Sequence, residues 1–134
     1  MDYVTRNHAK YLIMAHLIFV CKYRKTLLTG HVSMEMKLIL YDVAEENDFE
    51  ILQMETDKDH VHLLVNYNPT QSILEVVRLL KQVSTFRMWR QNNNHKWLVK
   101  HFWKEGTFWS DGYFACSIGN ISKATAEKYI QSQG

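Results

Sequence analysis

The chain of 134 residues is 46% hydrophobic and 22% charged, as expected for a single globular domain covering residues 1–134. It has no 18-residue apolar run and no signal-peptide pattern, which argues against a membrane protein or a secreted one. Its formal net charge is only +2, which says little by itself. Cys21 and Cys116 lack CxxC spacing, so we expect reduced cysteines and a cytoplasmic location.

Hydrophobic periodicity predicts alternating strands and helices in the first half of the chain. The first strand is expected to run into a basic turn that begins at Lys22. In chain order, the expected elements are a strand at 11–23, a helix at 34–47 with Ser33 as its N-cap, a strand at 49–55, a turn at 56–59 and a strand at 60–67.

The second half continues with a strong helix start. Ser72 and Glu75 have the spacing of a capping box, and the helix is expected to reach about Gln91. Residues 97–108 give no clear pattern, 109–118 are expected to form a strand, and a short helix is expected from Ser122 through Tyr129. This order predicts an α+β fold, a ferredoxin-like βαββαβ sandwich with an extra C-terminal helix.

Two histidines two residues apart, His60 and His62, lie in the apolar run that forms the predicted strand at 60–67. Alternate residues of a strand share a face, so their backbones are about 6.5 Å apart on one side of the sheet. That spacing suits two ligands of one divalent metal. A pair of partly buried, hydrogen-bonded histidines explains the same pattern.

Tyr129 and Gln133 are spaced i, i+4, which places both on one face of a helix. An amide oxygen is a hard donor suited to Mg²⁺ or Mn²⁺, and a nearby metal would let a tyrosine attack phosphorus near neutral pH. Gln131 is a competing ligand candidate, although its i+2 spacing puts it on a different face. Tyr129 could instead simply anchor a terminal helix.

The distribution of charge favours a polyanionic partner. Residues 76–104 contain no Asp or Glu, and basic side chains alternate there with Phe86, Trp89, Trp97, Phe102 and Trp103. Cations and aromatic rings suit phosphates and unpaired bases, whereas buried tryptophans with solvated lysines are the alternative. The candidate DNA-binding residues are Lys22, Arg24, Arg78, Lys81, Arg87, Arg90, Lys96 and Lys100.

Taken together, these motifs resemble the HUH single-tyrosine transposases of bacterial and archaeal insertion sequences, the insertion-sequence-200/605 type. The resemblance covers nearly the whole chain. It is carried by His16 to Leu28 with its Lys-Tyr-Arg turn, by Asp59 to Val65, by Trp109 to Gly119, and by Lys128 to Gln133.

The resemblance implies a metal site and a nucleophile. His60, His62 and Gln133 would bind Mg²⁺ or Mn²⁺, and Tyr129 would attack single-stranded DNA beside a hairpin at the element end. The products would be a 5′-phosphotyrosine and a free 3′-OH, which allow cleavage and rejoining without ATP. It also implies a homodimer, in which the helix that carries Tyr129 can be donated to the histidines of the partner subunit, so that one active site is built from two chains.

Three other functions fit parts of the sequence. A non-catalytic single-stranded nucleic-acid-binding module, or a domesticated relative, would use the same fold without transposition. A histidine-triad hydrolase needs a third alternating histidine, but position 64 is Leu. A 2H phosphoesterase needs a second His-x-Ser/Thr motif in a strand, and the other match, His31 with Ser33, opens a predicted helix.

Overall fold

The computed structural model describes residues 4–6, 9–91, 94–102, 105–117 and 129–133, with side chains from Leu12 onward. Its strands are β1 (Val4–Arg6), β2 (Ala9–Tyr11), β3 (Met14–Val20), β4 (Glu50–Asp57), β5 (His60–Asn66) and β6 (Phe114–Ser117). Its helices are α1 (Gly30–Glu46), α2 (Ile73–Arg90) and α3 (Asn94–Phe102), and a 3-10 turn, η1, covers Lys22–Arg24.

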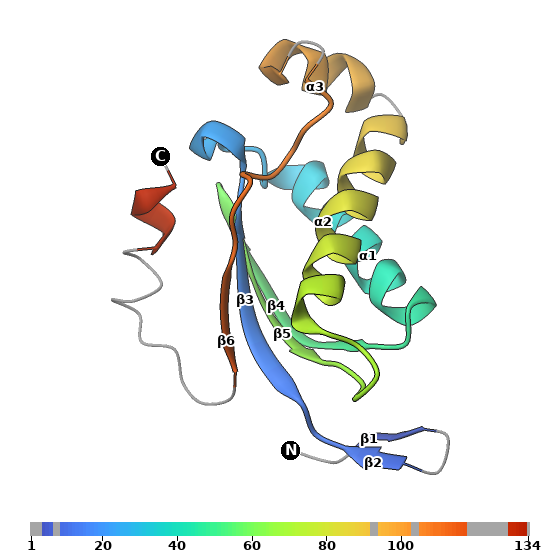
Figure 1. Ribbon diagram of the computed structural model, residues 1–134. Helices are drawn as coiled ribbons and strands as arrows, with labels where there is room; N and C mark the ends of the chain where they lie inside the picture. Colours follow the sequence, from blue (N-terminus) through green and yellow to red (C-terminus); the bar gives the residue numbers. More distant parts are fainter. Residues whose placement is uncertain (1–3, 7–8, 92–93, 103–104, 118–128, 134) are drawn as a thin grey trace.

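Four strands form one antiparallel sheet in the order β4-β5-β3-β6. The helices α1 and α2 pack against each other and cover one face of the sheet (Figure 1). β1 and β2 form a separate two-stranded hairpin near the N-terminus. The predicted order of strands and helices is therefore confirmed from β3 to α2, and a strand follows at β6, but α3 between them was not predicted.

The core lies between the sheet and the helices because the strands alternate their side chains between two faces. Leu17, Phe19, Val61 and Leu63 point into this core and are fully buried. His60 and His62 occupy the alternate positions of β5, so they lie on the face turned away from α1 and α2. No helix among the described residues has the length and apolarity needed to cross a bilayer.

Several predicted boundaries need correction. Helix α1 begins at Gly30 with Thr29 as N-cap, and the hydroxyl of Ser33 bonds Thr56 Oγ1 at 2.7 Å, so the predicted Ser33 cap is wrong. The fourth strand is shorter than predicted, since only a single bridge, Cys21 to Trp109, precedes β6. The unassigned stretch contains α3.

Two further predictions concern the ends of helices. The capping box of Ser72 and Glu75 is confirmed, with both reciprocal hydrogen bonds present at the start of α2. The predicted start of the C-terminal helix at Ser122 lies outside the described residues, which show helical backbone at 129–132.

Candidate active site

His60 and His62 lie on β5 where it pairs with β3, opposite Val20 and Ile18 respectively. The carboxylate of Asp59 orients the His60 ring through a hydrogen bond, with His60 Nδ1 2.9 Å from Asp59 Oδ1. Asp59 also forms an ion pair with Arg24 at 3.5 Å. This arrangement leaves His60 Nε2 for another partner and resembles the carboxylate–histidine pairs that orient metal ligands.

His62 contacts a third histidine of the same face. Its Nε2 atom lies 3.1 Å from Nδ1 of His16 on β3, and the two ring centroids are 5.2 Å apart. Partial burial lowers the pKa of His62, and the neighbouring His16 and His60 lower it further, against the opposing effect of Glu55. A neutral imidazole is the form that binds a metal, and His62 Nδ1 is the ring nitrogen not facing His16.

Tyr129 and Gln133 lie together against residues 110–112. Ser110 Oγ donates to Gln133 Oε1 at 3.3 Å, and the Tyr129 ring packs on Phe114 with centroids 5.6 Å apart. A methyl group placed on Gly112 would lie 3.5 Å from Gln133 Oε1 and 3.6 Å from the Tyr129 hydroxyl. The Tyr129 hydroxyl is buried and has no hydrogen-bond partner among the described residues.

Burial also determines the protonation of this tyrosine. Removing the phenolate from water is unfavourable, so the pKa of Tyr129 rises from 10.0 to about 12. In this position the hydroxyl stays protonated at neutral pH, and it would need a general base or a nearby cation to act as a nucleophile.

Val20 connects the two parts of the predicted site, the histidines of β5 and the segment 110–112 that contacts Tyr129 and Gln133. Val20 is the register partner of His60, and its carbonyl accepts a hydrogen bond from Ser110 N at 2.7 Å. Since adjacent strands are about 4.8 Å apart, the backbones of His60 and Ser110 are separated by roughly 10 Å. Residues 129–133 thus adjoin the end of the sheet that carries His60 (Figure 1).

Two imidazoles and an amide oxygen are donor types that fit a divalent metal. No group of three or more histidine, cysteine or carboxylate side chains among the described residues is placed to hold a metal ion. A third protein ligand to a metal held by His60 and His62 would therefore be a donor of another kind, and the Gln133 amide is the predicted one. Gln131 is exposed, whereas Gln133 is half-buried beside Ser110 and Tyr129.

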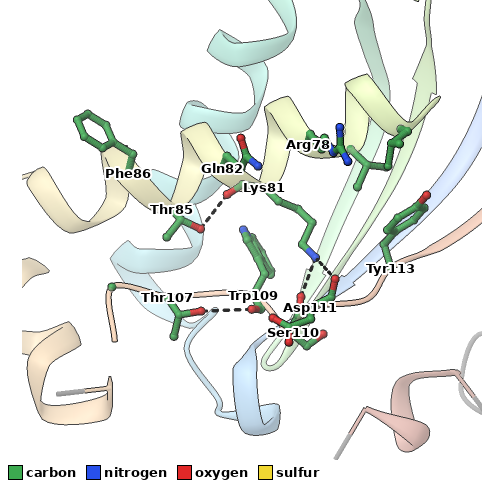
Figure 2. Close-up of a pocket in the computed structure, with 13 residues that line it drawn as sticks. Arg78, Lys81, Gln82, Thr85, Phe86, Thr107, Trp109, Ser110, Asp111 and Tyr113 are labelled. Atoms are coloured by element: carbon green, nitrogen blue, oxygen red, sulfur yellow. Dashed lines mark hydrogen bonds between the residues drawn. The ribbon is translucent and has the colours of Figure 1, made fainter. Parts of the chain in front are cut away.

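A groove of about 530 Å³ separates α2 from residues 106–113. Arg78 and Phe86 line it from α2, and Trp109 and Tyr113 line it from the other side (Figure 2). Lys81 crosses the groove and donates to three main-chain carbonyls, those of Ser110 at 2.7 Å, Asp111 at 3.1 Å and Gly112 at 2.9 Å.

The eight predicted DNA-binding cations fall into two groups. Arg78, Arg90, Lys96 and Lys100 are exposed on α2 and α3. The other four have protein partners: Lys22 pairs with Asp111, Arg24 with Asp59, Arg87 with Glu46, and Lys81 with the three carbonyls. Arg24 is exposed as well, but its charge is paired with Asp59. Arg78, Arg90, Lys96 and Lys100 are therefore better placed to meet phosphates, and DNA binding by any of the eight stays a prediction.

The aromatic residues of the basic span are mostly structural. Phe102 is buried, Trp97 packs against the core, and Trp89 Nε1 donates to the carbonyl of Thr107 at 2.8 Å. Phe86 is 58% exposed, with the Arg90 guanidinium 4.4 Å from its ring centroid. Of the described aromatics in that span, Phe86 is therefore the one available for base stacking; Trp103 lies outside the described residues.

Sequence reasoning did not identify Asp59, Ser110 or Gly112 as parts of the site, and it assigned Lys81 to DNA. A carboxylate directly before the first histidine was a usable signal for Asp59. Ser110 and Gly112 carry no such signal, because their role depends on which main-chain segment lies beside Val20.

Comparison with known proteins shows the family of this chain. Residues 9–133 match the family model described as "Transposase IS200 like". The ISDra2 transposase TnpA of Deinococcus radiodurans is 37% identical over 123 residues, which cover 92% of this chain and 85% of that protein. The transposase for insertion sequence element IS200 of Salmonella typhimurium is 28% identical over 131 residues, covering 96% and 79%.

Two solved structures are similar in fold. A candidate transposase from Deinococcus radiodurans superposes with a TM-score of 0.83 at 31% identity, covering 99% of this chain and 98% of the other. A REP-associated tyrosine transposase bound to a REP hairpin has a TM-score of 0.56 at 15% identity, covering 97% and 68%, and supports the fold alone. With the family model matched over nearly the whole chain, the protein belongs to the IS200-like transposases, of the IS200/IS605 TnpA type.

Proposed function

We propose that this transposase cleaves and rejoins single-stranded DNA through a covalent bond to Tyr129. The observation that carries the proposal is the placement of Tyr129 and Gln133 together against Ser110–Gly112, next to the strand end that bears His60. In the reaction, a bond forms between the tyrosine oxygen and phosphorus, and the bond from phosphorus to the 3′ oxygen breaks. The phenolic proton passes to solvent, and the departing 3′ oxygen takes up a proton from solvent and leaves as a hydroxyl.

His60, His62 and Gln133 would hold Mg²⁺ or Mn²⁺, a HUH-type metal site. When bound, such an ion polarises a phosphate oxygen and stabilises phenolate near neutral pH. Asp59 fixes the His60 ring so that Nε2 is free, and His16 orients the His62 ring. Phe114 and Gly112 position the Tyr129 ring and hydroxyl on the face of the sheet shared with His62.

The substrate we propose is a DNA hairpin near the element end, with cleavage in the adjoining single strand. A solved structure of similar fold holds a REP hairpin, which makes a hairpin the first substrate to test. The strand order β4-β5-β3-β6 with helices on one face supports the ferredoxin-like assignment of the fold. We further propose a homodimer.

The direct test is incubation of labelled single-stranded DNA from the flanks of the gene with the protein and Mn²⁺. We expect a covalent protein–DNA band that is absent in Tyr129→Phe, although hairpin binding survives. His62→Ala should lose the metal-dependent cleavage. An adduct that persists in Tyr129→Phe refutes the role of Tyr129, and binding without cleavage by the wild type indicates a non-catalytic binding module.

A mixture of subunits tests whether the site is shared. Tyr129→Phe protein retains its histidines, and His62→Ala protein retains its tyrosine. Recovery of adduct formation in the mixture shows that one subunit supplies its tyrosine to the partner's histidines. No recovery shows that each tyrosine acts with the histidines of its own chain.

A further inference from the structure

Lys81 is unusual among the basic residues of α2 because its charge is directed at the protein's own main chain. An ammonium group has three N–H donors, and Lys81 places its Nζ within 3.1 Å of three successive carbonyls, at Ser110, Asp111 and Gly112. Figure 2 shows the side chain extending from α2 to this segment. All three donors therefore have partners, and a DNA phosphate would have to displace one of them.

The same three-residue segment forms the surface that receives the tyrosine. Ser110 contributes a hydroxyl to Gln133, and Gly112 lies against both the Gln133 oxygen and the Tyr129 hydroxyl. Gly112 has no side chain, so Gln133 and Tyr129 can lie close to its main chain. The carbonyl of the same residue accepts a hydrogen bond from the Lys81 ammonium. The contact of Lys81 with the tyrosine is thus indirect, through the main chain of residues 110–112.

We propose that Lys81 is a positioning residue for Tyr129, holding residues 110–112 in the conformation that docks the tyrosine and Gln133. This inference rests on the proposed nucleophilic role of Tyr129. Burial of the ammonium lowers the pKa of Lys81, with Asp111 opposing that effect.

Loss of the three Lys81 hydrogen bonds should not unfold the protein, because other hydrogen bonds join residues 109 and 110 to α2 and to β3. Trp109 Nε1 donates to Ser84 Oγ at 3.0 Å, and Ser110 N donates to the Val20 carbonyl at 2.7 Å. Lys81→Met keeps the length and apolar part of the side chain while it removes the three donors. We therefore expect a folded variant in which residues 110–112 are less well ordered.

The first experiment compares covalent adduct formation by wild type, Lys81→Met and Lys81→Arg on a hairpin substrate with Mn²⁺. Misplacement of a reacting group by about 1 Å can cost about 100-fold, so we expect the single-turnover rate of Lys81→Met to fall about 10- to 100-fold. The hairpin Kd and its salt dependence should stay unchanged. Lys81→Arg can reach some of the carbonyls and should recover part of the rate.

A change in Kd and salt dependence with an unchanged saturated rate would overturn the proposal, because it would show that Lys81 contacts DNA. Lys37→Met, a half-buried lysine on α1, is the matched control and should keep the wild-type rate.

The second experiment does not depend on cleavage. A fluorinated tyrosine is introduced at position 129, and its ¹⁹F resonance is compared in the wild-type and Lys81→Met backgrounds. We expect the resonance to move toward that of a solvent-exposed tyrosine in Lys81→Met. An unchanged resonance refutes the positioning role, whether or not the wild type forms an adduct.

Gly112 provides an independent variant should Lys81→Met fold poorly. A methyl group at this position makes ordinary van der Waals contacts with Gln133 and Tyr129, so Gly112→Ala should keep the docked resonance. The additional methyl groups of Gly112→Val should displace the tyrosine and lower the adduct rate. A docked resonance in Gly112→Val would contradict the proposal that this segment is the docking surface.

Discussion

At the scale of single residues, the environment of each side chain decides its chemistry. Tyr129 is one of seven tyrosines, yet its hydroxyl is buried without a partner among the described residues and its pKa rises to about 12. Tyr23, by contrast, is exposed and donates its hydroxyl to Glu105. The same side chain is thus an unpaired buried phenol at one position and an ordinary surface hydrogen-bond donor at another.

The first prediction concerns the titration of Tyr129. The difference in 295 nm absorbance between wild type and Tyr129→Phe should titrate with a midpoint near 12, rather than at the ordinary value of 10.0. Because the pKa is raised in the folded state, the neutral phenol favours docking below pH 10, and this contribution is lost as pH rises through about 12. A midpoint near 10.0 would show that the tyrosine is not buried in solution.

The second prediction concerns Asp59, which is 2.9 Å from His60 Nδ1. Asp59→Asn removes the negative charge that orients this ring, so we expect Mn²⁺ affinity to fall about 10-fold or more. Isothermal titration with Mn²⁺ measures the change. Asp42→Asn, an exposed carboxylate on α1, is the control and should bind Mn²⁺ as the wild type does; equal affinities for Asp59→Asn would exclude a supporting role for the carboxylate.

At the scale of secondary-structure elements, α2 links the core to the site. Val76, Val77 and Leu80 bury one side of the helix against the sheet, while Lys81 reaches residues 110–112. Its start is set by the Ser72 and Glu75 capping box. This buried stripe fixes the rotation of α2 about its axis and therefore the direction in which Lys81 extends.

The third prediction tests this helix start. Ser72→Ala removes the acceptor of the Glu75 N–H, at 3.1 Å, and should lower the free energy of unfolding by about 0.5–2 kcal/mol. Urea denaturation followed by circular dichroism gives the value. Ser72→Asp retains a capping oxygen and should remain close to the wild type, and an Ala variant as stable as the wild type would show that the cap contributes nothing.

At the scale of the whole molecule, the acidic and basic residues are distributed unevenly but are partly paired. The basic span 76–104 contains no acidic residue, yet Arg87 of that span pairs with Glu46 of α1. Lys22 and Arg24 likewise pair with Asp111 and Asp59. The net field available to a polyanion is therefore smaller than the count of basic residues indicates.

The fourth prediction follows from this pairing. Arg78→Gln and Lys100→Gln should each reduce the slope of log affinity for hairpin DNA against log salt concentration, by about 0.7–0.9 per lost phosphate contact. Arg87→Gln should leave the slope nearly unchanged because its partner is Glu46. Filter binding at several salt concentrations measures the slopes, and a larger effect at Arg87 than at Arg78 would refute this division of the cations.

Local sequence patterns were sufficient for β5 and α2. Alternation in residues 60–66 and the spacing of apolar residues in α2 predicted these elements within a residue or two, because burial of one face imposes its period on the sequence. The start of α1 was missed, since Ser33 forms its hydrogen bond with Thr56 of a distant strand, which no local pattern encodes.

The pairing of Tyr129 with Gln133 was determined by the sequence itself, because a helix places residues i and i+4 on one face wherever the helix lies. Tertiary structure decided what these residues meet. His62 faces His16 because β3 and β5 are neighbours in this register, and Lys81 binds three carbonyls because α2 crosses residues 110–112. Contacts between segments distant in sequence depend on the packing of the whole chain. The sequence alone therefore could not predict the contact of Lys81 with residues 110–112, and its positive charge was interpreted as a DNA contact.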